Sequence, residues 1–223
     1  MIISAKSLPD VFKEDPQSVK FKSVYELYKS DALFFTDSDN NFALSVLDKN
    51  AILCGEVKDK EELLSFLKAI GAKSVFLSAK NAENTGFKEV KQVGVYSKQN
   101  EETADLKSDD LSSFEVYEML KKGGFSLPDY EYFAVDYCRR INHKKAALFA
   151  KKNEFAAIGF LSGNLCLVNG IVSLKKGGGR KAISGLFSAA KAEKMLACAE
   201  DKNRGFYEKC GFELTDLCAY CYI

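Results

Sequence analysis

Short apolar runs alternate with amphipathic stretches along the first half of the chain. Between the first two runs, apolar residues recur at the spacing of one helix face and end at Gly71. Asp59 and Glu62 stand before them at capping-box spacing, so a helix is expected to begin there. The runs themselves have the length and the polar borders of β-strands, and they cover residues 51–57, 74–78 and 90–96.

The second half of the chain shows the same alternation with more elements. Ser112 and Glu115 predict the start of a helix that stops at Gly123, and a second helix begins near Pro128 and reaches about Asn142. Short turns then separate three apolar runs, which predicts an antiparallel meander. The meander strands, the next helix and the last two strands are expected over residues 146–151, 155–161, 165–174, 183–190, 195–199 and up to 223.

A polar segment separates the two halves. Residues 97–110 read SKQNEETADLKSDD and carry almost no apolar side chains, which is typical of a linker. The halves also echo each other, since residues 74–96 and 195–220 both run from one strand through a Gly-Phe pair to a strand that ends at a tyrosine. The sequence therefore predicts the α/β (α+β) class, with a mixed, mostly antiparallel sheet flanked by helices and a duplicated fold. The expected parts are a domain over 1–100, a linker over 101–110 and a domain over 111–223.

Composition indicates the cellular compartment of the protein and excludes some classes of binding partner. The 32 basic and 31 acidic residues nearly cancel, so the chain has no global attraction to nucleic acid or to an anionic membrane. No apolar run has the length of a membrane span, and the N-terminus lacks the pattern of a signal peptide. Seven cysteines, an odd number mostly within apolar runs, fit free thiols in a reducing compartment. With a single histidine and no second cysteine pair near Cys218-x-x-Cys221, we expect a cytoplasmic protein without a metal site.

A glycine-rich segment joins a predicted strand to a predicted helix. It reads KKGGGRK from Lys175 to Lys181. A turn of this kind leaves several N–H groups at a helix start pointing to one spot, which favours a pyrophosphate. The segment is not a P-loop, because Ala182 rather than Ser or Thr follows Lys181. A solvated hairpin tip is the alternative interpretation, and the loop alone does not decide between them.

A second motif gives the loop a context. The segment from Asn203 to Phe212 reads NRGFYEKCGF, and it resembles the signature of the GNAT superfamily of N-acetyltransferases, in which an Asn-containing turn leads to an aromatic-Tyr-Glu-Lys-x-Gly-Phe run. Residues 172–182 resemble the acetyl-CoA motif of that superfamily at the same strand-loop-helix position. Residues 132–143 are similar to a helix of tandem GNAT proteins whose first half binds no cofactor. The resemblance implies a GNAT fold with a degenerate GNAT-like N-terminal domain and an acetyl-CoA-binding C-terminal domain.

The resemblance also implies roles for individual residues. Tyr207 would be the general acid that protonates the departing CoA thiolate. The strand before the loop would offer its backbone to the pantetheine arm, and the loop amides would hold the pyrophosphate. Valine at both Gly178 and Gly179 is then expected to weaken acetyl-CoA binding and to leave the fold intact. The expected cofactor-binding residues are Ile171, Val172, Ser173, Gly177, Gly178, Gly179, Arg180, Lys181, Ala182 and Asn203.

Three functions follow from these motifs. The first is acetyl transfer from acetyl-CoA to an amine of a small molecule or a peptide. The second is a catalytically inactive GNAT-fold module for CoA binding or interaction. One alignment of the loop puts Lys181 where the family motif has a glycine, the other puts Gly179 there and Lys181 at the final small position of the motif, and no general base is evident. The third is a nucleic-acid binder that uses the basic loop, but the cluster is short, lacks interleaved aromatic residues and lies in a neutral chain. The sequence identifies neither the acceptor nor the oligomeric state.

Overall fold

The computed structural model describes residues 1–99 and 107–223 and divides the chain into two compact units. The second unit consists of Ser97–Ala197 and Phe206–Glu213. The end of the chain therefore groups with its beginning, whereas the sequence pattern placed 111–223 in one domain. The first unit is made of Met1–Tyr96, Cys198–Gly205 and Leu214–Ile223.

The first unit is built on a mixed sheet. Strands β1 to β4 pair antiparallel in chain order, and β4 then runs parallel to β5. Helix α1 packs on β3 and β4, and α2 packs on β1. The elements are β1 (Ile2–Ser4), α1 (Pro16–Tyr28), β2 (Leu33–Asp37), β3 (Phe42–Leu47), β4 (Asn50–Gly55), α2 (Lys60–Ala69), β5 (Ser74–Ser78), α3 (Ala79–Ala82) and β6 (Glu89–Gln99).

Strand β11 (Glu213–Tyr222) explains why the C-terminal residues belong to the first unit. It pairs antiparallel with β5, with Cys218 opposite Ser78 and Tyr222 opposite Ser74. Its inward side chains Ala219 and Cys221 are fully buried in the core that Leu63 and Leu77 share. Hydrogen bonding and burial both tie this strand to the first half of the chain, and β6 is its neighbour on the other side.

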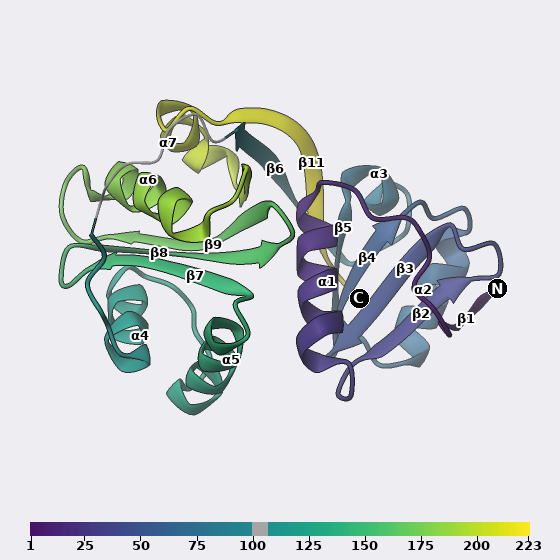
Figure 1. Ribbon diagram of the computed structural model, residues 1–223. Coiled ribbons are helices and arrows are strands. Elements are labelled where there is room, and N and C mark those ends of the chain that lie inside the picture. The colour runs from purple at the N-terminus through teal and green to yellow at the C-terminus, as the bar shows by residue number, and fades with distance from the viewer. Residues whose placement is uncertain (100–106) are drawn as a thin grey trace. The chain divides into compact units, whose positions relative to one another are not determined.

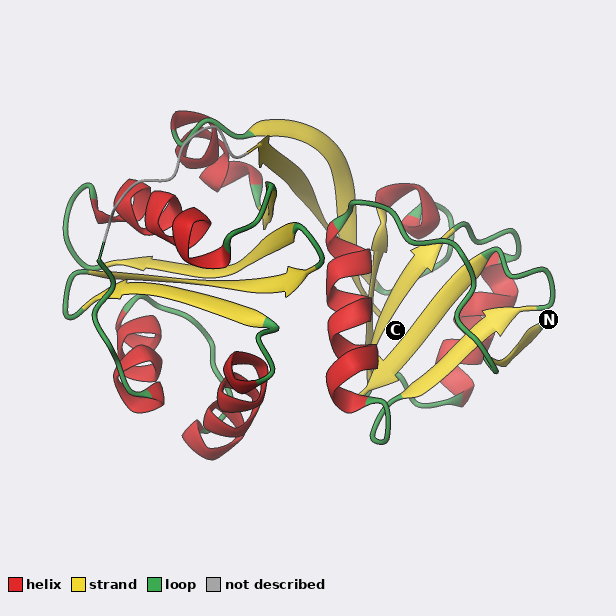
Figure 2. Ribbon diagram, in the orientation of Figure 1, coloured by secondary structure: helices red, strands yellow, loops and turns green. Residues whose placement is uncertain are grey.

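The second unit carries helices on both faces of its sheet. Strands β7, β8 and β9 form the expected antiparallel meander, and β10 runs parallel to β9. Helix α6 lies on one face and helices α4 and α5 on the other (Figure 1), and the same layers appear in red and yellow in Figure 2. The elements are α4 (Ser113–Lys122), α5 (Tyr130–Asn142), β7 (Ala146–Lys151), β8 (Phe155–Ser162), β9 (Leu165–Ser173), α6 (Gly178–Ala190), β10 (Lys194–Ala199) and α7 (Arg204–Lys209).

The fold class is confirmed, and the order of elements repeats. A three-stranded meander, a helix, a parallel strand, a short helix and a final strand occur first from β2 to β6 and again from β7 to β11. The capping box at Ser112 and Glu115 is present, with reciprocal hydrogen bonds between side chain and backbone. Of the expected linker, 101–106 lies outside the described residues. Asp109 is anchored to β7, because its amide donates to the Ala150 carbonyl at 2.8 Å.

Candidate functional site

The candidate site begins at the open edge of β9. Strand β10 pairs with β9 from Leu165 to Val168 only, so the following residues of β9 have no partner on that side among the described pairings. On its other side β9 pairs with β8, with a bulge that leaves Asn169 without an opposite residue. The edge from Asn169 to Ser173 therefore offers backbone groups to a ligand, which is where the sequence placed the pantetheine contacts.

Helix α6 starts directly after this edge, and its first turn has no side-chain cap. Gly177 is the N-cap residue in a left-handed conformation with φ of 82°, and the first turn contains no acidic residue. The amide of Gly178 donates to the carbonyl of Lys175 at 3.1 Å. The next amides, of Gly179 and Arg180, belong to the first turn, which has no carbonyl partners within the helix. The helix dipole adds positive potential at this end, so the turn suits an anion.

The segment around Tyr207 lies against this helix start, although the two are far apart in sequence. The guanidinium of Arg180 donates through Nη2 to the carbonyl of Lys209, near the end of α7. A Cβ atom built on Gly179 would lie 2.8 Å from the Phe206 ring, so the two backbones approach closely. The structure thus brings the glycine loop and the NRGFYEKCGF motif together, and the sequence alone could not show this contact.

A hollow of about 670 Å³ lies between the loop and α7. Its charged lining residues are all basic: Lys175, Lys176, Arg180 and Lys209. Lys175 is already paired with Glu154, at 2.9 Å between Nζ and Oε1. Lys176 and Lys209 have no ion-pair or hydrogen-bond partner for their side chains within residues 1–99 and 107–223, so their charges are available to a ligand.

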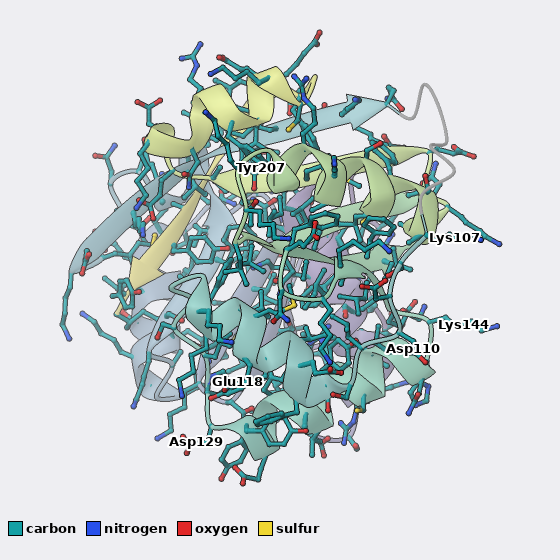
Figure 3. The ribbon with its side chains drawn as sticks, turned by 90° about the vertical axis from the view of Figure 1, so that its left-hand side faces the viewer. Lys107, Asp110, Glu118, Asp129, Lys144 and Tyr207 are labelled. Atoms are coloured by element: carbon teal, nitrogen blue, oxygen red, sulfur yellow. The ribbon has the colours of Figure 1, made fainter. Side chains whose placement is uncertain are left out.

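Tyr207 is half-buried in an aromatic cluster. Its ring centroid lies 5.2 Å from that of Phe206 and 5.5 Å from that of Phe212, both at steep angles. Its carbonyl accepts from the amides of Cys210 and Phe212, which fixes the turn after α7. Figure 3 shows Tyr207 on the α6 side of the sheet, well separated from the carboxylates of Glu118 and Asp129 on the α4–α5 side. Neither of these carboxylates is placed to act on the tyrosine.

The expected cofactor-binding residues are distributed unevenly around the hollow. Ser173, Gly177, Gly179 and Arg180 line it. The lining residues outside the predicted set are Leu174, Lys175, Lys176, Phe206, Lys209 and Cys210. Asn203 lies in the exposed 3₁₀ turn Asp201–Asn203, within the first unit. Residues not among its lining are Ile171, Val172, Gly178, Lys181 and Ala182, and the side chains of Val172 and Ala182 are buried. A signal for Lys209 and Cys210 was present, because both belong to the recognised motif.

Gly178 and Gly179 are required by the packing of the protein itself. A Cβ at Gly178 would lie 2.6 Å from Ser173 Oγ and 3.1 Å from the Phe155 ring, and one at Gly179 would meet Phe206. The expectation that valine at both positions leaves the fold intact is therefore wrong. Cofactor contacts in this loop have to be tested through the lysines instead.

Thiol and metal chemistry add little to the site. All seven cysteines are free, and burial raises the pKa of the Cys166 thiol to about 12. In the part of the chain that the structure describes, no group of three or more His, Cys, Asp or Glu side chains could hold a metal ion. No helix there is long and apolar enough to cross a membrane.

Comparisons with known proteins agree on the fold. The sequence matches no protein-family model and no curated protein. An acetyltransferase of the GNAT family from Colwellia psychrerythraea aligns over 100% of both chains with a TM-score of 0.55 and 14% identity. A putative acetyltransferase from Pyrococcus horikoshii aligns over 100% of this chain and 88% of its own, with a TM-score of 0.58 and 12% identity.

A tandem arrangement also has a structural counterpart. A tandem GNAT protein from the clavulanic acid biosynthesis pathway aligns over 98% of this chain and 90% of its own, with a TM-score of 0.54 and 10% identity. At such low identities these similarities establish the fold alone. The part of the chain that the structure describes has the GNAT fold, as the motifs of the second half indicated.

Proposed function

We propose that the protein is an acetyl-CoA-dependent N-acetyltransferase whose cofactor site lies in the second unit. The observation that supports this best is that the uncapped start of α6 and the segment that carries Tyr207 meet around a hollow whose charged lining residues are all basic, next to the open edge of β9. The fold of the protein is that of solved GNAT acetyltransferases. We place this activity in the cytoplasm, because the scattered cysteines fit free thiols in a reducing compartment.

The residues around the hollow fit the charged part of CoA. Its pyrophosphate carries negative charge, and the hollow combines two available lysines with first-turn amides of a helix. Strand β10 does not pair with Ile171, Val172 and Ser173, and in this proposal their backbone would bind the extended pantetheine arm along the β9 edge. These groups would bind acetyl-CoA and orient its thioester. Holding the amine and the thioester together supplies much of the rate acceleration.

The chemistry requires one proton donor from the protein. When bound, acetyl-CoA supplies the acetyl group as a thioester: the amine lone pair forms the new C–N bond while the C–S bond breaks, and the electron pair goes to sulfur. The hydroxyl of Tyr207 would give its proton to that sulfur, and a phenol with an ordinary pKa of about 10 suits a thiolate. The nitrogen loses its proton to water. Water then returns a proton to the Tyr207 phenolate, so the protons balance over the cycle.

Two measurements on the whole chain test this function. Calorimetry determines whether the protein binds acetyl-CoA, and thiol release measures turnover over a broad panel of amines. Binding with turnover of at least one amine is the expected result. Absence of acetyl-CoA binding at millimolar concentration would contradict the proposal at its first step.

A non-catalytic CoA-binding module is the second candidate. The specific observation that favours it is that the carboxylates of Glu118 and Asp129 lie on the α4–α5 side of the sheet, away from Tyr207, where neither can act as a base beside it. In both alignments of the loop with the family motif, Lys181 takes a position that the motif gives to a small residue. Acetyl-CoA binding without turnover of any amine is the result that would favour this candidate.

Replacing Lys176 and Lys209 together by alanine is expected to weaken acetyl-CoA binding about tenfold, which corresponds to about 1.4 kcal/mol. Both side chains line the hollow and are exposed, so the fold should not change. Calorimetry at low and high salt gives the measurement, because lost phosphate contacts also reduce the salt dependence. Lys122→Ala, at the exposed end of α4, is the matched control. Equal affinities of the double variant and the control would remove both lysines from the site.

A further inference from the structure

A second cavity lies on the opposite face of the second unit. It has a volume of about 280 Å³ and is enclosed by α5, by the segment that leads into it, and by strands β7, β8 and β9. This volume is just below the range for ligand pockets, which is roughly 300–1,000 Å³. The cavity therefore has room for a small group such as one ring system. Its aromatic lining residues are Phe125, Tyr132, Phe133, Tyr137 and Phe160.

Only some of the aromatic rings of this cavity pack on the hydrophobic core, and the others are exposed to solvent. Phe133 and Tyr137 stack at 5.6 Å between centroids and pack on the core beneath α4. Tyr132, in contrast, is 73% exposed, and Phe125 is 36% exposed. Burial raises the pKa of Tyr137 to about 12, so this phenol stays neutral at physiological pH. The cavity thus has an apolar floor and an aromatic mouth that is open to solvent.

The charges in the cavity cancel. Asp136 and Arg140 are its only charged lining residues, and Arg140 Nε donates to both carboxylate oxygens of Asp136 at 2.9 Å. The guanidinium also lies over the Phe160 ring, 4.2 Å from its centroid. A polycationic ligand would find one carboxylate here, already paired, and no further anionic partner. An apolar, planar group would instead meet rings on several sides.

The cavity reaches the strand that carries the proposed thioester site. Its lining includes Asn169 and Gly170 of β9, and Asn169 is the bulged residue. A Cβ at Gly170 would lie 3.5 Å from the Phe125 ring, an ordinary contact distance, so Gly170 lies directly beside the aromatic lining. The open edge of β9 begins at the same two residues, because β10 pairs with β9 only as far as Val168. A ligand in the cavity would thus lie beside this edge, across the sheet from α6.

We infer that this cavity receives the acetyl acceptor and selects an amine attached to an aromatic or comparably flat apolar group over polycationic amines. The inference rests on the proposed function, because it uses β9 as the place where the acetyl group is presented. The rings hold the apolar body of the acceptor, and its nitrogen points to the Asn169–Gly170 end, where the lone pair attacks the thioester carbon as described above. In an apolar pocket one extra or missing methylene group alone changes the discrimination by about 10–200-fold, so we expect at least about tenfold here.

The experiment compares amines of three chemical types on the whole protein. The probes are tryptamine and 2-phenylethylamine, n-butylamine, and the polycations spermidine and kanamycin. Thiol release gives kcat/KM for each, and calorimetry measures binding of tryptamine without acetyl-CoA. We expect the arylalkylamines to exceed the polycations at least tenfold in kcat/KM and tryptamine to bind in the absence of cofactor.

The variants separate the cavity from the general surface. Tyr132→Ala with Phe125→Ala should lower both tryptamine binding and its kcat/KM about tenfold, and Tyr132→Phe should retain them because the ring stays. Val135→Ala is the matched control, since Val135 is 61% exposed on the same helix and does not line the cavity. Tyr132 and Phe125 lie at the surface, so the double variant should fold, and far-UV circular dichroism checks this.

The failure of this inference can be told apart from the failure of the proposed function. A preference for polycations, or a double variant that behaves like Val135→Ala, would overturn the cavity as the acceptor site while turnover continues. Tryptamine binding that is lost in the double variant but retained in Val135→Ala, without turnover of any amine, would support the cavity as an amine site and reject catalysis. Lack of tryptamine binding in a wild type that acetylates other amines would reject the aromatic class.

Discussion

Tyr207→Phe is expected to lower the turnover of the best amine substrate about 10²-fold or more while acetyl-CoA still binds. The phenyl ring keeps the contacts with Phe206 and Phe212, whose centroids lie 5.2 and 5.5 Å away. The carbonyl of residue 207 continues to accept from Cys210 and Phe212, because these are backbone hydrogen bonds. Only the O–H group is lost, so the change separates proton donation from packing.

Thiol release from acetyl-CoA, wild type against variant, measures the effect, and calorimetry measures cofactor affinity in parallel. Tyr222→Phe serves as the control for loss of a phenolic hydroxyl, since Tyr222 is 49% exposed and lies in the first unit. A variant as active as the wild type would assign the acid role to another group. An equal loss of acetyl-CoA affinity would instead indicate that the hydroxyl binds the cofactor.

Gly185→Ala is expected to destabilise the protein by about 2–3 kcal/mol, within the range of about 1–3 kcal/mol for overpacking a core. A Cβ at Gly185 would lie 2.1 Å from two atoms of the Phe149 ring. Phe149 cannot move away easily, because it is buried and stacks on Phe155 at 6.0 Å between centroids. The gain in helix propensity from alanine, about 0.5–1 kcal/mol, is too small to offset the clash.

Urea unfolding followed by far-UV circular dichroism is the suitable measurement, because the chain contains no tryptophan. Gly205→Ala is the matched control: it also lies in a helix, but no atom would lie within 4 Å of its Cβ, so stability should be unchanged or slightly higher. Phe149→Leu in the Gly185→Ala background should restore part of the loss by making room. Equal stability of Gly185→Ala and the wild type would mean that α6 can shift freely on β7.

The elements of the second half could be predicted because local signals agree there. The capping box at Ser112, the turns of the meander and the apolar period after the glycine loop all indicate the structures that form. Helix α1 gave no such signal. Its buried face includes the polar residues Gln17, Ser18 and Ser23, so apolar residues do not mark one side of it.

The sequence could predict which segments form the candidate site, but it could not predict which of their atoms are available to a ligand. The two motifs identified the glycine loop and the segment that carries Tyr207, and Phe206 and Lys209 of that segment contact the loop. Which amides are already used, as that of Gly178 is, depends on turn geometry that several sequences can adopt. The aromatic cavity drew no prediction, because its rings come from α5, β8 and the segment before α5, and only the packed chain shows that they share a space.

The pairing of β11 with β5 has a consequence for biosynthesis. Domains usually fold in order as the ribosome releases them, the N-terminal one first. Here β5 ends at Ser78 and β11 begins at Glu213, so the N-terminal unit lacks a strand until the nascent chain has almost reached Ile223. At roughly 5–20 residues per second, translation of the intervening chain takes on the order of 10 s. During that time the edge of β5 lacks its native partner, and an unpaired strand edge is a template for pairing with another chain.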